Sequence, residues 1–174
     1  IMGNMLMVNK LSASYDKNSP EIITDLSFGL EKGTVLNILG QNAVGKTTLI
    51  RCLVRELRNY SGEILVEGKE SRNYSIKEYS RKIGVVTATF NAYQNLLVAD
   101  YLLTGFTNQI SPFARPKREQ IENAYACLEL FEKQELFNKL IGNLSSGEKQ
   151  IVMIARVILQ NPQMIIVDEP TANL

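Results

Sequence analysis

Hydrophobic and polar residues alternate along the first thirty residues of the chain. The alternation runs over Met5 to Leu11 and again over Ile22 to Leu30, and the turn-forming sequence SYDKNSPE separates the two runs. A period of two places successive side chains on opposite faces of a strand. The pattern therefore predicts two antiparallel strands joined as a hairpin-like opening of the fold.

The next part of the chain has the pattern of an α/β layer. The apolar run TVLNILG (34–40) is typical of a strand buried on both faces, and a glycine-containing loop and an expected helix over Lys46 to Leu57 follow it. The sequence EILVEG (63–68) and the run from Ile83 to Thr87 predict two more strands, with one or two helical turns over Ile76 to Lys82 between them.

Helical spacing dominates from Thr89 to Gln160. We expect helices over Val98 to Phe106 and Gly147 to Leu159, and an amphipathic helix between them. The residues expected on the core-facing side of that middle helix are Ile121, Ala124, Tyr125, Leu128 and Phe131. A strand returns over Gln163 to Val167. These patterns predict one α/β domain, 1–174, with a core of 1–88 and 161–174 and a helical subdomain of 89–160.

Composition narrows the classes of function. Lys and Arg number 19 against 18 Asp and Glu, a net charge of +1, so no strongly basic surface points to a nucleic-acid partner. Histidine is absent, which excludes histidine-based catalysis or metal ligation within these residues. The two cysteines, Cys52 and Cys127, lie in apolar patterns and indicate buried thiols in a reducing compartment.

The sequence GQNAVGKTT between the expected strand and helix predicts a phosphate-binding loop. Glycines let successive backbone N–H groups point into one concavity, a lysine adds charge at the β- and γ-phosphates, and a threonine hydroxyl suits Mg²⁺. The alternative is a glycine turn with a chance lysine. The candidate ATP-binding residues are Gly40, Gln41, Asn42, Ala43, Val44, Gly45, Lys46, Thr47 and Thr48.

Two acids follow the last apolar strand in MIIVDEP. Asp168 and Glu169 lie at the carboxyl end of that strand, where ligands gather in open α/β sheets. We expect Asp168 to share the Mg²⁺ with Thr47, and Glu169 to polarise the attacking water as a general base. Taken alone, the pair is more typical of a solvated turn, but after a phosphate-binding loop the roles in metal binding and water activation are favoured.

The stretch LSSGEKQ precedes the last expected helix. Its local interpretation is an N-cap at Ser145 supported by Glu148. A helix start bearing small hydroxyls and glycine can also receive a γ-phosphate, including one that another copy of the chain carries. The candidate residues are Ser145, Ser146, Gly147 and Glu148.

The three motifs, in this order, resemble those of the ATP-binding subunit of ABC transporters: Walker A (GQNAVGKTT), the signature (LSSGEKQ, usually LSGGQ) and Walker B (MIIVDEP). The segment NLLVADYLLTGFTNQISPF is most similar to ATPases of iron-chelate and vitamin B12 uptake. The resemblance implies a P-loop NTPase core and places Tyr15 where an aromatic ring stacks on adenine.

The resemblance also implies partners and a location. ATP and Mg²⁺ at Lys46 of one subunit would be completed by Ser145 and Gly147 of another in a head-to-tail homodimer or pseudo-dimer. A transmembrane permease subunit would hold that dimer at the inner, cytoplasmic face of the cell membrane.

This sequence departs from the family pattern at two places. Ala88 stands where the family has a glutamine that reaches Mg²⁺ and the attacking water, and Gln94 lies six residues further on, from where only a rearranged loop could bring it back. The family also continues past TANL to a histidine that contacts the γ-phosphate, so relative to that pattern we expect a C-terminally cut chain with reduced catalytic competence.

Two alternatives to a transporter ATPase stay open at this point. One is a soluble ABC-type ATPase without a permease, and the other is a nucleotide-binding module with little hydrolysis, for which Ala88 would be the marker. A permease that copurifies with the protein would exclude the first alternative, and phosphate release would exclude the second.

Overall fold

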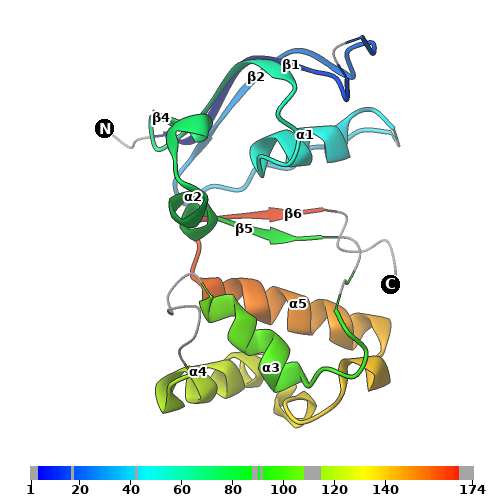
Figure 1. Ribbon diagram of the computed structural model, residues 1–174, viewed down its shortest axis with the longest axis vertical. Coiled ribbons are helices and arrows are strands. Elements are labelled where there is room, and N and C mark those ends of the chain that lie inside the picture. Colours follow the sequence, from blue (N-terminus) through cyan, green and yellow to red (C-terminus); the bar gives the residue numbers. More distant parts are fainter. Residues whose placement is uncertain are drawn as a thin grey trace. The chain divides into compact units, whose positions relative to one another are not determined.

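The computed structural model describes residues 4–16, 18–41, 43–87, 90, 92–107 and 115–168. The chain divides into two compact units, Ile1–Tyr79 and Ser80–Leu174, and Figure 1 follows both from the N-terminus to the C-terminus. In the described part of the chain, no helix combines the length and the apolar character that crossing a bilayer requires.

The first unit is built on a four-stranded antiparallel sheet. The strands β1 (Asn4–Ala13), β2 (Ile23–Glu31), β3 (Tyr60–Val66) and β4 (Lys69–Glu70) lie in the order β2-β1-β3-β4. Val8 of the central strand β1 pairs with Phe28 on one side and Ile64 on the other, and both Val8 and Ile64 are fully buried. The alternating pattern therefore predicted the opening hairpin correctly.

Three short helices complete the first unit and lead into the second: α1 (Lys46–Leu53), the 3-10 turn η1 (Ser71–Asn73) and α2 (Ile76–Lys82). The expected helix over Lys46 to Leu57 ends at Leu53, because the chain turns at Arg55, which has a φ of 66°. The hydroxyl of the buried Tyr79 on α2 donates to the carbonyl of Leu53 over 2.6 Å and fastens that turn.

The expected buried strand over residues 34–40 is not present. These residues have no regular secondary structure, and the side chains of Val35 and Leu39 are 86% and 92% exposed. A strand buried on both faces needs hydrogen-bonded neighbours, and no strand of the described residues pairs with this segment. An apolar run indicates that burial is favourable but does not specify its partners.

The second unit has three layers. The strands β5 (Ile83–Val86) and β6 (Met164–Val167) form a parallel pair, α5 (Ser146–Gln160) packs against β5, and α3 (Val98–Leu103) and α4 (Arg118–Glu129) cover the other side of α5 (Figure 1). Short 3-10 turns, η2 (Thr104–Phe106), η3 (Gln134–Leu136) and η4 (Ile141–Asn143), join the helices. The strand β6 is half-buried rather than buried, since Ile165 and Val167 are exposed.

The helices of the second unit enclose an apolar core. Its fully buried members include Leu102, Leu128, Leu136, Ile141 and Val152. On α4 the core face consists of Ala124, Cys127 and Leu128, whereas Ile121 and Tyr125 are 41% and 40% exposed. The prediction that Ile121 and Tyr125 face the core was therefore wrong, because the helix lies at the rim of the core.

Each unit contains one of the two cysteines. Cys52 lies in the core of the first unit and Cys127 in that of the second, and neither forms a disulfide. Burial raises the pKa of the Cys52 thiol to about 11, and burial also raises the pKa of Cys127.

Candidate functional site

The loop before α1 is bent by a glycine that no other residue could replace without strain. Gly45 has a φ of 104°, and a Cβ built on it would lie 3.3 Å from both the carbonyl oxygen and the Cγ2 atom of Ile22. A side chain at this position would meet an unfavourable backbone conformation and a crowded neighbour. The bend therefore lets the backbone N–H groups of the first turn of α1 face the loop. Asn42 lies outside the described residues.

The lysine of the loop turns back onto the backbone. The Nζ atom of Lys46 donates to the carbonyl oxygens of Gly40 and Gln41 over 2.6 and 3.0 Å. Among the described residues, no side chain caps the start of α1, and no acidic residue occupies its first turn. An uncapped helix start beside a lysine attracts anions through its N–H groups and its dipole. The loop thus fits the polyphosphate of a nucleotide.

The aromatic residue predicted to stack on adenine lies beside α1. The hydroxyl of Tyr15 is 3.3 Å from the Oγ1 atom of the buried Thr48, and the ring is 46% exposed. The guanidinium of Arg51 lies 5.8 Å from the ring centroid and donates to the hydroxyl over 3.5 Å. Sequence reasoning missed Arg51, although Thr48 and Arg51 share a face of α1 through their three-residue spacing.

The Walker B aspartate extends the parallel strand pair by one hydrogen bond. The backbone N–H of Asp168 donates to the carbonyl of Val86 over 2.9 Å, so this carboxylate sits directly at the carboxyl ends of β5 and β6. Carboxylate and threonine oxygens are suitable ligands for Mg²⁺. The exposed Thr47 belongs to the first unit and Asp168 to the second. Glu169 lies outside the described residues.

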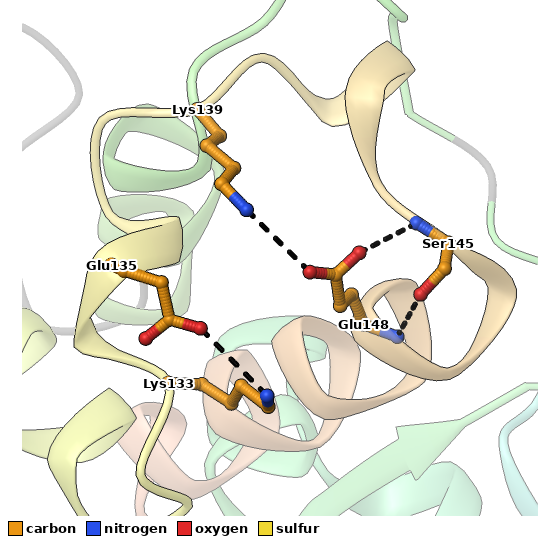
Figure 2. Close-up of polar contacts among 5 residues, drawn as sticks. All are labelled: Lys133, Glu135, Lys139, Ser145 and Glu148. Carbon is orange, nitrogen blue, oxygen red and sulfur yellow. Dashed lines mark hydrogen bonds and ion pairs between the residues drawn. The ribbon is translucent and has the colours of Figure 1, made fainter.

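The signature stretch forms the expected N-cap of α5. The Oγ atom of Ser145 accepts from the Glu148 backbone N–H over 3.3 Å, and the Glu148 carboxylate accepts from the Ser145 backbone N–H over 2.7 Å (Figure 2). This bond from the Ser145 backbone is the main reason why the pKa of Glu148 lies below its ordinary value. Sequence reasoning missed Lys139, whose Nζ atom lies 3.6 Å from the second carboxylate oxygen of Glu148.

Gln94, the glutamine considered for the water-positioning role, is bonded through its backbone to the segment before the signature. The carbonyl of Gln94 accepts from the Gly142 backbone N–H over 2.8 Å, in the segment just before the signature. Three further backbone hydrogen bonds hold this region. The Ile141 N–H donates to the carbonyl of Leu96. The Val98 N–H donates to the carbonyl of Lys139, and the Ala99 N–H donates to that of Phe137. Ala88 lies outside the described residues.

Comparisons with known proteins give consistent results. A family model described as ABC transporter matches residues 23–172. The phosphonates import ATP-binding protein PhnC of Alcaligenes faecalis is 33% identical, and the match covers 98% of this chain and 64% of that protein. A Helicobacter pylori protein named as a probable iron chelatin transport ATP-binding protein is 32% identical, with coverage of 98% and 66%.

A solved structure shows the same fold. The structure of cbiO1 from Clostridium perfringens, part of the ABC transporter complex cbiONQ, is 29% identical with a TM-score of 0.84, covering 99% of this chain and 68% of that one. The expected fold class, a P-loop nucleotide-binding α/β core with N-terminal antiparallel strands, is confirmed. The chain spans about two thirds of the length of the curated relatives named above, 64% and 66%.

Proposed function

This chain belongs to the ABC transporter family of ATP-binding proteins, and on that premise we propose that it binds and hydrolyses ATP as the energy-coupling subunit of an importer. The expected resemblance to transporter ATPases, iron-chelate ATPases among them, is thereby confirmed. Import is the direction in the name of the phosphonate relative, and the Helicobacter pylori relative is named for iron chelatin transport.

The observation that carries this proposal is the loop geometry before α1. A left-handed Gly45, an uncapped helix start and a lysine held over two loop carbonyls form a cradle for a triphosphate. When phosphate oxygens enter this cradle, Lys46 exchanges its carbonyl partners for them and neutralises the charge that develops there.

The remaining site residues receive roles that follow from their chemistry. Tyr15 contributes a half-exposed ring for the adenine, and Thr47 and Asp168 supply oxygens for Mg²⁺, which would neutralise phosphate charge when bound. Glu169 accepts a proton from the attacking water. In this proposal 1–88 and 161–174 form the nucleotide-binding core, and 89–160 form the helical subdomain that presents the signature.

A second subunit completes the site in this proposal. Ser145 is an N-cap whose hydroxyl oxygen accepts from Glu148, so its hydroxyl hydrogen can donate to a phosphate oxygen of a partner. Outside its own helix backbone and chain neighbours, a Cβ built on Gly147 meets no atom of the described residues within 4 Å, which leaves room for close approach. The dimer would dock on a transmembrane permease at the cytoplasmic face of the membrane.

Replacement of Glu169 by glutamine tests the proposal directly. Without a carboxylate to accept the proton, bound ATP is not hydrolysed, and the nucleotide stays between two subunits. We expect full-length Glu169→Gln protein to double its mass in light scattering when Mg²⁺ and ATP are added. Glu129→Gln, at an exposed position on α4, is the matched control and should not accumulate a dimer. A Glu169→Gln protein that stays monomeric at saturating ATP would refute the proposal.

Replacement of Gly147 by alanine separates folding from assembly. Alanine is the better helix former, so the free energy of unfolding should rise by about 0.4–1 kcal/mol. The added methyl group meets no atom of the described residues within 4 Å, apart from its chain neighbours and its own helix backbone, but stands where the partner's phosphate approaches. With Gly147→Ala added to the Glu169→Gln protein, we expect the ATP concentration for half-maximal dimerisation to increase roughly tenfold, about 1.4 kcal/mol. Unchanged dimerisation in a stabilised variant would contradict the role of this surface.

A further inference from the structure

The signature of this chain contains a negative charge at a place where its family usually has a neutral glutamine. The family pattern LSGGQ reads LSSGE here, with Glu148 at the final position. Its carboxylate lies in the first turn of α5, bonded to the Ser145 backbone N–H. A phosphate that approaches Ser145 from a partner would meet this charge, and like charges repel.

A lysine from another segment lies against the same carboxylate. Figure 2 shows the Lys139 side chain extending toward Glu148, where its Nζ atom is 3.6 Å from the Oε1 atom, while the Oε2 atom accepts from Ser145. The Glu148 side chain is 23% exposed and that of Lys139 is 43% exposed. One carboxylate therefore caps the helix and pairs with a cation at the same time.

The backbone of Lys139 is held firmly in this position. Its N–H donates to the carbonyl of Leu136 over 2.9 Å, and its carbonyl accepts from the Val98 N–H over 3.0 Å. Leu136 and Ile141, which flank it, are fully buried. The lysine is thus attached to the helical core, and its side chain is directed to the signature by a fixed backbone.

We propose that Lys139 is a positioning residue of the signature: it fixes the Glu148 carboxylate in the helix cap and offsets its charge, so that α5 can accept the triphosphate of a partner subunit. This inference rests on the proposed function. Lys139 contacts no nucleotide and acts only through Glu148. It accounts for a glutamate at a position where a neutral amide would otherwise be favoured.

The chain contains a matched control for a general effect of surface ion pairs. Lys133 and Glu135 approach to 3.7 Å (Figure 2). The Lys133 side chain is 38% exposed, close to the 43% of Lys139, whereas Glu135 is 51% exposed against 23% for Glu148. Exposed pairs of this kind contribute little to stability. Replacement of Lys133 should therefore reproduce any nonspecific effect of removing a lysine from this subdomain.

The test compares Lys139→Met, Glu148→Gln, the double variant and Lys133→Met in the full-length Glu169→Gln protein. Light scattering gives the ATP concentration for half-maximal dimerisation, and a fluorescent ATP analogue gives the affinity of the monomer. We expect Lys139→Met to raise the ATP concentration for half-maximal dimerisation roughly tenfold. In the double variant this concentration should lie within about twofold of that of Glu148→Gln, because glutamine still caps the helix and carries no charge that Lys139 must offset. Lys133→Met should match the parent, and monomer affinity should be unchanged throughout.

The outcomes that contradict the inference differ from those that contradict the proposed function. If the parent protein dimerises with ATP but Lys139→Met matches it, or if the double variant is as impaired as Lys139→Met, then Lys139 does not act through Glu148. Such an unrescued defect would indicate a role in folding. If the parent binds no ATP analogue, or binds it and never dimerises, then the proposed function fails and this inference fails with it.

Discussion

Replacement of Lys46 by methionine should lower ATP hydrolysis by at least about 100-fold, the effect typical of removing one group that stabilises transition-state charge. Methionine keeps most of the unbranched side chain but has no charge with which to neutralise the β- and γ-phosphates. The two bonds that the lysine donates to the carbonyls of Gly40 and Gln41 lie at an exposed loop. We therefore expect the free energy of unfolding to change by less than about 1 kcal/mol.

The measurement is phosphate release by the full-length protein, together with titration of a fluorescent ATP analogue. The control is Lys32→Met, which removes an exposed lysine of the same unit outside the phosphate loop and should leave turnover unchanged. Turnover by Lys46→Met that equals the parent would mean that the loop before α1 does not hold the reacting phosphates, and the assignment of the site would be wrong.

Replacement of Leu128 by alanine should destabilise the second unit by about 2–5 kcal/mol. Leu128 is fully buried among residues that include Leu136 and Ile141, and the cavity left behind would lose both transfer free energy and packing contacts. Because Ile141 and Leu144 of this core lie just before Ser145, loosening the core should also weaken ATP-dependent dimerisation.

Urea unfolding followed by circular dichroism measures this change. Leu130→Ala is the matched control, since Leu130 follows directly after α4 but is 75% exposed, and its replacement should alter the free energy of unfolding by less than about 0.5 kcal/mol. Equal effects of the two replacements would show that Leu128 does not anchor the core of the second unit.

Local sequence signals predicted the parts of the fold whose hydrogen bonds are local. The alternation from Met5 to Leu11 is sufficient for β1, because a strand's faces are set by its own period. The N-cap of α5 follows from Ser145 and Glu148 alone, since both partners lie within one helical turn. The candidate phosphate loop is likewise a local prediction, because its lysine and glycines are neighbours in sequence.

Features that depend on distant partners were not predictable. Residues 34–40 have the composition of a buried strand, yet no strand of the described residues pairs with them. Ile121 and Tyr125 fit the helical spacing but lie at the edge of the core, whose extent is set by α3 and α5. Lys139 could not be assigned to Glu148 because the contact arises from the way in which the segment before η4 is fastened to Val98.

The placement of one cysteine in the core of each unit gives the protein two internal reporters. A thiol reacts with alkylating reagents as the thiolate, and burial both shields these thiols and raises their pKa. Modification at Cys52 therefore requires local opening of the first unit, and modification at Cys127 requires local opening of the second unit. Because the sequence contains only two cysteines, the alkylation rate at each one reports how often its own unit opens.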